Sequence, residues 1–211
     1  AGYARNPGQR LKVEMSNPKP FIQSSIFRKQ LIAITGLVMI GFVIVHLSGN
    51  LLIYKGPKAF NDYSHFLHSL GGLLWVARIG LILSFVVHVY LTLQLVRENM
   101  AARPQRYEVD APKGDRNFAA LTMKYTGLFV VAFLILHLYD FTFGNHEGPQ
   151  SVISSVGTDS LGLFGLVWNS FKVTDPIGWA RVPIYIIAVS SVGLHLSHAI
   201  QSLFQTLGFN H

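Results

Sequence analysis

The sequence contains four long apolar runs that carry no Asp, Glu, Lys or Arg. They lie between Lys29 and Lys55, between Arg78 and Arg97, between Lys124 and Asp140, and after Arg181. A bilayer span needs about 20 apolar residues, and the residues beside the short third run extend it to that length. With 50% hydrophobic and 13% charged residues, the composition is that of a membrane protein. We therefore expect an all-α transmembrane helix bundle with four visible spans, at residues 29–54, 71–97, 118–143 and 178–206.

The basic residues predict how the bundle is oriented. Twelve of the seventeen Lys and Arg residues lie before the first charge-free run or between the second and third of these runs. Cytoplasmic loops hold an excess of Lys and Arg, so the N-terminus should be cytoplasmic. Residues 1–28 then form a cytoplasmic segment and residues 29–211 a single bundle. The net charge of +7 follows from this topology and does not indicate a nucleic-acid partner.

Each apolar run contains a histidine several helical turns from the nearest charge in at least one direction: His46, His88, His137 and His195. An ionisable side chain inside lipid is costly and points to function. Such a histidine can bind a haem iron. It can also hydrogen-bond a neighbouring helix, line a proton path or bind a non-haem metal.

The four histidines fall at two depths. At about 1.5 Å of rise per residue, His46 lies about 25 Å from the cytoplasmic end of its run, and His88 lies only about 14 Å from that end of its own. The same count places His137 near the outer face and His195 deeper. We expect an outer pair of His46 with His137 and an inner pair of His88 with His195. Two imidazoles on facing helices suit a haem iron, which they bind from opposite sides.

An internal repeat supports this pairing. The segment ITGLVMIGFVIVHL, which ends at Leu47, aligns without gaps with YTGLFVVAFLILHL, which ends at Leu138. Thr35 and Thr126 stand eleven residues before their histidines, roughly at the depth of the inner pair. The pattern predicts a duplicated pair of helices, with these threonines beside the inner haem.

Small side chains near the histidines have two interpretations. Ser84 and Ser191 stand four residues before His88 and His195, so they either accept a hydrogen bond from the ring nitrogen that is not bound to iron or bond to their own backbone. Several glycines permit close helix approach or leave room for a porphyrin: Gly36, Gly41, Gly80, Gly127 and Gly193. The chain has no cysteine, so histidine alone would hold a haem, and no iron–sulfur cluster is ligated here.

Nearly the whole chain resembles the diheme cytochrome b membrane-anchor subunit of the succinate:quinone oxidoreductases, the family of succinate dehydrogenase and quinol:fumarate reductase. The resemblance is carried by FRKQLIAITG before His46, AFNDYSHFLHSL in the first loop, His88, TGLFVVAFLILHLYD with His137, and GLHLSHAIQSLFQTLG. In that family the first histidine of the terminal motif is the ligand, which selects His195 over His198. Members usually have a fifth span after this motif, which is absent from this chain.

The resemblance implies a function shared among subunits in the inner, cytoplasmic membrane of a prokaryote. A flavoprotein subunit with FAD oxidises succinate, and an iron–sulfur subunit passes the electrons to this anchor. Two haem b groups, the inner one and then the outer one, carry them to a quinone, often menaquinone, and fumarate reduction runs in reverse.

Quinone reduction consumes protons, so we expect a protonatable group near the quinone. His65 and His68 at the outer side are candidates, and solvated loop histidines are the equal alternative. An inner quinone site could use His198 or Gln201. Three cations could pair with haem propionates or act as interfacial anchors: Arg78, Lys124 and Arg181.

The connecting segments 98–117 and 144–177 contain no nucleotide-binding or hydrolase motif. Within the second, LGLFGLVWNSF predicts a short interfacial helix on the outer side. Two other functions stay open. One is the cytochrome b subunit of a hydrogenase or formate dehydrogenase, against which the first-loop and terminal motifs argue. The other is a haem-free proton translocator that uses the histidines as a relay.

Overall fold

A computed structural model describes residues 24–102, 118–143, 152–153, 158–159, 162–172 and 176–208. The expected all-α transmembrane bundle is confirmed, because four of its helices are long and apolar enough to cross a bilayer. These are α1 (Ser25–Asn50), α3 (Gly72–Ala101), α4 (Phe118–Phe141) and α6 (Pro176–Thr206). The protein is therefore a multi-pass membrane protein. Most of the expected 1–28 segment lies outside the described residues, and α1 begins slightly earlier than expected.

The first connection is mostly helical, although the sequence analysis treated it as a loop. Helix α1 continues into the short 3₁₀ helix η2 (Leu51–Lys55), and Gly56 then turns the chain with φ of 96°, a conformation that favours glycine. Helix α2 (Pro57–Ser69) follows, with Pro57 in its first turn, where the missing N–H costs nothing.

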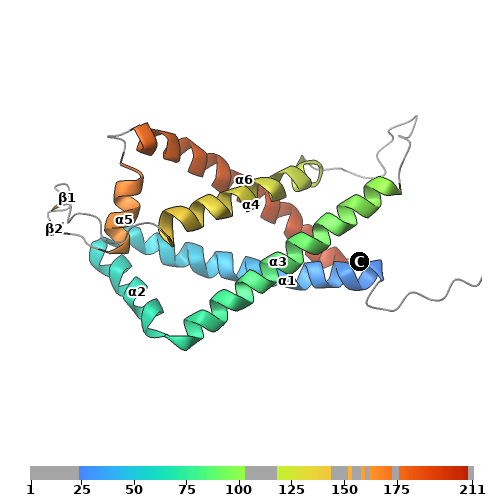
Figure 1. Ribbon diagram of the computed structural model, residues 1–211, viewed down its shortest axis with the longest axis horizontal. Coiled ribbons are helices and arrows are strands. Elements are labelled where there is room, and N and C mark those ends of the chain that lie inside the picture. Colours follow the sequence, from blue (N-terminus) through green and yellow to red (C-terminus); the bar gives the residue numbers. More distant parts are fainter. Residues whose placement is uncertain are drawn as a thin grey trace, which may run out of the picture.

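A short helix after the third span is also present, as expected from its sequence. Helix α5 (Leu163–Ser170) lies beside α2 at one end of the bundle, opposite the end at which α1 begins (Figure 1). The rings of Phe60 and Phe164 are buried between α2 and α5, and Asn61 Oδ1 accepts a 3.0 Å hydrogen bond from the Phe164 N–H. Before α5, the two-residue strands β1 (Val152–Ile153) and β2 (Thr158–Asp159) pair antiparallel.

The four spanning helices form two pairs. Helix α1 packs mainly on α3, and α4 packs mainly on α6, with a smaller contact between α1 and α6 (Figure 1). Arg28 near the start of α1 donates two hydrogen bonds, of 2.6 and 2.9 Å, to the carboxylate of Glu98 near the end of α3. Because α1 aligns with α4 in the sequence repeat, the two helix pairs are the duplicated unit that the repeat predicts.

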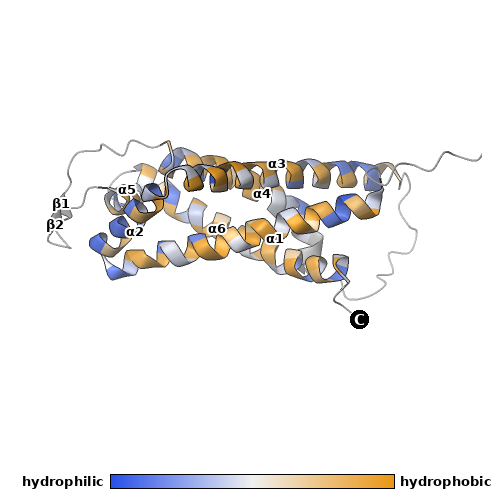
Figure 2. Ribbon diagram, turned by 90° about the horizontal axis from the view of Figure 1, so that it is seen from below, coloured by the Kyte–Doolittle hydropathy of each residue, from blue (hydrophilic) through white to orange (hydrophobic). Residues whose placement is uncertain are grey.

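The spanning helices bury few apolar side chains against one another. Among the described residues, the buried apolar side chains are Ala33, Ala188, Phe60 and Phe164, and the two phenylalanines belong to the α2–α5 contact. Apolar residues run along the helices, with hydrophilic residues mostly toward the ends (Figure 2). The helices therefore touch through small residues, and most of their large apolar side chains are left for lipid or for the space between the helices.

The buried ring of Phe164 should hold α5 against α2. We expect Phe164→Ala to lower the free energy of unfolding by about 3 kcal/mol, since a buried phenylalanine leaves a cavity when it is truncated. Denaturant unfolding in detergent measures the loss. Phe143→Ala, which truncates a side chain that is 77% exposed, is the control and should change stability little. Equal losses in the two variants would contradict the packing role.

Candidate functional site

Two histidines from equivalent positions of the repeat face each other near the α2–α5 end. The ring centroids of His46 on α1 and His137 on α4 lie 5.7 Å apart, and the ring planes are at 87° to each other. His46 stands four residues before the end of α1, which places the pair close to η2 and α2. The structure therefore brings together the two residues of the expected outer pair.

Aromatic rings surround the outer pair. Phe42 stacks on His46 with ring centroids 5.2 Å apart. Three further rings lie 5.3 to 6.3 Å from His137, measured between centroids: Phe133, Phe141 and Tyr185. Within the described part of the chain, His137 Nδ1 is buried and has no hydrogen-bond partner. Ring packing thus positions His137 and leaves one of its polar nitrogens unsatisfied.

The inner pair is held by hydrogen bonds to the neighbouring helix. His88 Nδ1 lies 3.2 Å from Thr35 Oγ1 and 3.1 Å from the Ile32 carbonyl oxygen, both on α1. In the other half of the repeat, His195 Nδ1 lies 3.3 Å from Thr126 Oγ1 on α4. His88 and His195 lie near each other. Both halves therefore use the same contact, a histidine of the second helix on a threonine of the first.

These contacts also give the depth of the inner pair. Thr35 precedes His46 by eleven residues on α1. Its contact with His88 therefore places the inner pair about 16 Å from the outer pair, toward the start of α1. The same spacing separates Thr126 from His137 on α4. The depth expected for the two threonines, beside the inner histidines, is confirmed.

The hydrogen-bond network assigns the proton of the inner imidazoles. The Thr35 hydroxyl has one proton, and it donates that proton to the Leu31 carbonyl oxygen at 2.7 Å. Its oxygen therefore accepts the hydrogen bond from His88, whose proton lies on Nδ1. Nε2 of His88 then keeps its lone pair, which is the form in which imidazole binds a metal.

The serines one turn before the inner histidines are not the hydrogen-bond partners of these rings. Ser191 donates a 2.9 Å hydrogen bond to the Ile187 carbonyl oxygen of its own helix, and the Nδ1 atoms of His88 and His195 bond to residues of α1 and α4 instead. Of the two interpretations of these serines, the structure favours the second, a bond to the backbone of the same helix, which Ser191 makes. Each imidazole thus contacts the neighbouring helix rather than the preceding turn of its own helix.

Two of the glycines noted in the sequence make room for the inner imidazoles. A Cβ on Gly36 would lie 3.4 Å from His88 Cε1, and one on Gly127 would lie 3.2 Å from His195 Cε1. A Cβ on Gly41, Gly80 or Gly193 would have no such neighbour within 4 Å. Each Thr–Gly dipeptide thus supplies a hydrogen-bond acceptor and the space for the ring that uses it.

A buried ion pair lies one turn beyond His137. Arg181 on α6 donates a 2.9 Å hydrogen bond to Asp140 Oδ1, and the Tyr185 hydroxyl donates a 2.8 Å hydrogen bond to Oδ2. The Asp140 side chain is only 1% exposed. In the sequence, Asp140 marked only the end of an apolar run, and Arg181 was a candidate propionate partner or interfacial anchor, although opposite charges at the same end of two spans were a signal of this pair. Arg181 is therefore already paired with a carboxylate of the chain itself.

Three further histidines were candidates for a quinone site: His65 and His68 on α2, and His198 on α6. His65 and His68 are exposed on α2, and His68 Nδ1 lies 2.8 Å from the Ser64 carbonyl oxygen. His198, one turn after His195, is partly buried, and its Nδ1 has no hydrogen-bond partner among the described residues.

Arg78 and Lys124 contact aromatic rings of their own helices. The Arg78 guanidinium lies 5.1 Å from the centre of the Trp75 ring, and Lys124 Nζ lies 4.8 Å from the centre of the Tyr125 ring. Cations stack in this way on aromatic faces, and Trp and Tyr are enriched at membrane interfaces. These contacts match the alternative of interfacial anchors.

An apolar hollow of about 540 Å³ opens on the face of α6. It is lined by Phe171, Val182, Tyr185, Ile186, Val189 and Ser190. Because the Tyr185 ring also contacts His137, the hollow lies at the level of the outer pair. Its lining suits an apolar ligand rather than a charged one.

The donor sets suit a haem iron. A haem iron takes only axial ligands from the protein, and two neutral imidazoles on opposing helices can supply them. The Nδ1–H form of His88 and the unsatisfied nitrogen of His137 agree with this fit.

Comparisons of the chain with protein-family models, with curated proteins and with solved structures found no match. The functional assignment therefore depends on the arrangement of the chain's own residues and on the motifs noted in its sequence.

Gly127→Ala should disturb the inner pair. The added Cβ would lie 3.2 Å from His195 Cε1, tighter than an ordinary contact, so the ring must move. Under the haem binding proposed below, added haemin should bind the inner pair about 10-fold more weakly, which is the size of effect expected when the contacts that support a metal ligand are displaced. A haemin titration of the apoprotein measures this. Gly193→Ala on α6 is the matched control, and an equal loss there would contradict the steric explanation.

Asp140→Asn should destabilise the outer half of the bundle. The substitution leaves the Arg181 guanidinium without its carboxylate in a partly buried place, at a cost of about 3 kcal/mol. Denaturant unfolding in detergent measures this cost. Asp62→Asn, which removes the exposed partner of Lys58, is the control and should have little effect. A similar stability of the two variants would contradict the importance of the buried pair.

Proposed function

We propose that this chain is the cytochrome b membrane-anchor subunit of a succinate:quinone oxidoreductase, and that it passes electrons between an iron–sulfur subunit and a membrane quinone. The observation that carries the proposal is the grouping of four intramembrane histidines into two pairs at two depths. Each pair joins equivalent residues of the two repeat halves, so each offers imidazoles from opposing helices.

His46 and His137 would hold one haem b, and His88 and His195 the other. The bound haems supply one-electron carriers, which neither the apolar helices nor the histidines can provide. The chain's own contribution is to present neutral imidazoles in an environment from which water is excluded. The inner pair does this through Thr35 and Thr126, and the outer pair does it through surrounding aromatic rings.

The two depths support a role in transfer across the membrane. The levels of the pairs are about 16 Å apart along α1, while the hydrocarbon core is about 30 Å thick. A single level would leave one membrane face distant, whereas two levels divide the crossing into shorter distances. This division suits an anchor that passes electrons from an iron–sulfur subunit at one membrane face to a quinone bound inside the membrane or near the opposite face.

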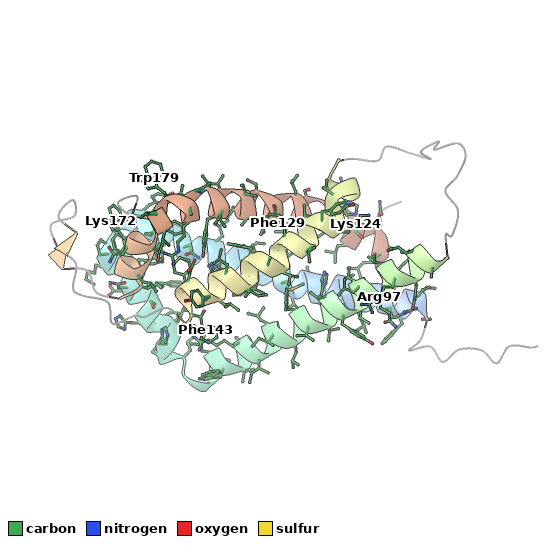
Figure 3. The ribbon with its side chains drawn as sticks, turned by 45° about the horizontal axis from the view of Figure 1, so that its top comes forward. Arg97, Lys124, Phe129, Phe143, Lys172 and Trp179 are labelled. Carbon is green, nitrogen blue, oxygen red and sulfur yellow. The ribbon has the colours of Figure 1, made fainter. Side chains whose placement is uncertain are left out.

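The distribution of basic residues supports the orientation. Arg97 and Lys124 lie at one end of the bundle, and Lys172 and Trp179 lie at the other (Figure 3). The first of these ends also begins α1, so a cytoplasmic N-terminus agrees with the excess of basic residues there. Under this proposal the chain lies in the inner membrane of a prokaryote, with the iron–sulfur and FAD-containing flavoprotein subunits docked at the cytoplasmic end.

The quinone, by our proposal menaquinone, would bind near the outer pair. The apolar hollow beside Tyr185 lies at this level and suits an isoprenoid tail. His65 and His68 on α2 are exposed at the same end of the bundle. These histidines are our candidates for proton donors when a quinone is reduced.

The test is a reduced-minus-oxidised absorption spectrum of the purified chain and of two variants. We expect two b-type haems in the wild type, and we expect His46→Ala and His88→Ala to remove different ones, because the two residues belong to different pairs. A pyridine haemochrome assay gives the number of haems per chain.

The rival functions give different results in the same experiment. A haem-free proton translocator has no redox-sensitive absorption. The cytochrome b subunit of a hydrogenase or formate dehydrogenase has haem, and the catalytic subunits that co-purify with it would identify it. Retention of both haems in both variants would refute the ligand assignment.

A further inference from the structure

We infer that Thr35 and Thr126 are positioning residues that set the redox equilibrium of the inner haem through the Nδ1 protons of His88 and His195. The inference rests on the proposed function, because it concerns the haem that these two histidines would hold. It adds a role for two hydroxyl groups that lie outside the ligand set.

The first support is that the same contact occurs twice. Thr35 Oγ1 lies 3.2 Å from His88 Nδ1, and Thr126 Oγ1 lies 3.3 Å from His195 Nδ1. Both threonine side chains are at least partly covered, and Thr126 is only 8% exposed. Many neighbouring side chains differ between the two halves of the repeat, but the threonine–histidine contact is present in both. The contact therefore belongs to the histidine pair rather than to one helix.

The second support is the direction of the hydrogen bonds. Thr35 donates its own proton to the Leu31 carbonyl oxygen at 2.7 Å, so its oxygen is an acceptor for the His88 N–H. Thr126 has the same choice of carbonyl oxygens one turn back, Met123 at 3.1 Å and Thr122 at 3.3 Å. Each threonine is thus the middle of a short chain that runs from imidazole N–H through hydroxyl to backbone carbonyl.

The third support is the contrast with the outer pair. His137 Nδ1 has no hydrogen-bond partner among the described residues, and the ring is packed among Phe133, Phe141 and Tyr185. The two pairs therefore have the same ligand type but different surroundings. A residue that acts through the hydrogen bond to Nδ1 should change the midpoint potential of the inner haem and leave that of the outer haem unchanged.

The sign of the effect follows from the chemistry of imidazole. An acceptor at Nδ1–H increases the electron density at Nε2 and strengthens its donation to the iron. Stronger donation favours ferric over ferrous iron and lowers the midpoint potential. Removing the acceptor should therefore raise the potential of the inner haem. The Ile32 carbonyl oxygen, 3.1 Å from His88 Nδ1, remains as a second acceptor, so the variant can still bind the haem.

The experiment is a redox titration of the full chain in its native membranes, followed by optical spectroscopy. The variants are Thr35→Val and Thr126→Val, singly and together, because valine keeps the shape and removes the oxygen. Thr35→Ser restores a hydroxyl, and Ser191→Ala removes a hydroxyl that bonds only to its own helix. The spectrum of His88→Ala, which retains the outer haem, identifies which titration step belongs to the inner haem.

We expect each valine variant to increase the ratio of reduced to oxidised inner haem by up to about tenfold at a given potential. This corresponds to a rise in midpoint potential of at most about 59 mV for a one-electron couple. The outer haem, Thr35→Ser and Ser191→Ala should keep wild-type midpoints. Loss of the inner haem from Thr35→Val, with normal binding and potential in Thr35→Ser, would also support the positioning role.

Three results would overturn the inference: unchanged potentials in the double valine variant, equal shifts of both haems, or a shift in Ser191→Ala as large as in Thr35→Val. A wild-type chain without haem would instead overturn the proposed function, so the two failures can be told apart.

Discussion

A polar imidazole inside a lipid-spanning helix needs a partner, and the arrangement of this bundle follows from how its four histidines obtain theirs. The inner histidines bond to threonines of the neighbouring helix. The outer histidines pack against each other and against aromatic rings. Because neighbouring lipid offers no hydrogen bonds, these contacts must come from the protein itself, and several of them come from another helix. They join α1 to α3, α4 to α6 and α1 to α4, and so link the whole bundle.

The duplication explains why the contacts come in pairs. When two similar halves pack face to face, equivalent residues meet across the contact, as they do in a symmetric dimer. His46 meets His137 in this way, and His88 lies near His195. One helix pair with two histidines, present twice in the chain, therefore suffices to build two pairs of opposed imidazoles. The Thr–Gly dipeptide is kept in both halves because each half needs the same acceptor and the same space for a ring.

The buried pair of Asp140 and Arg181 makes the two ends of the bundle different. It joins α4 to α6 one turn from the outer histidines and places a carboxylate there, which Tyr185 also contacts. At the opposite end, Arg28 and Glu98 join α1 to α3 closer to water. The outer pair thus lies beside a desolvated ion pair, whereas the inner pair has neutral hydroxyl and carbonyl partners. The two histidine pairs are in this way given different electrostatic surroundings.

The sequence by itself determined the spans, since charge-free runs of bilayer length leave few alternatives to membrane helices. It also determined which histidines share a depth, because helical rise is constant and the repeat aligns His46 with His137. Helix α2 was missed because it is too polar to span a bilayer, although the helical spacing of Phe60, Tyr63 and Leu67 was a signal of a helix that packs one face on α5. Only the tertiary structure decided the partners of the inner imidazoles. A side chain can bond to its own turn or to the next helix, and the crossing of the helices brought Thr35 and Thr126, rather than Ser84 and Ser191, to the ring nitrogens.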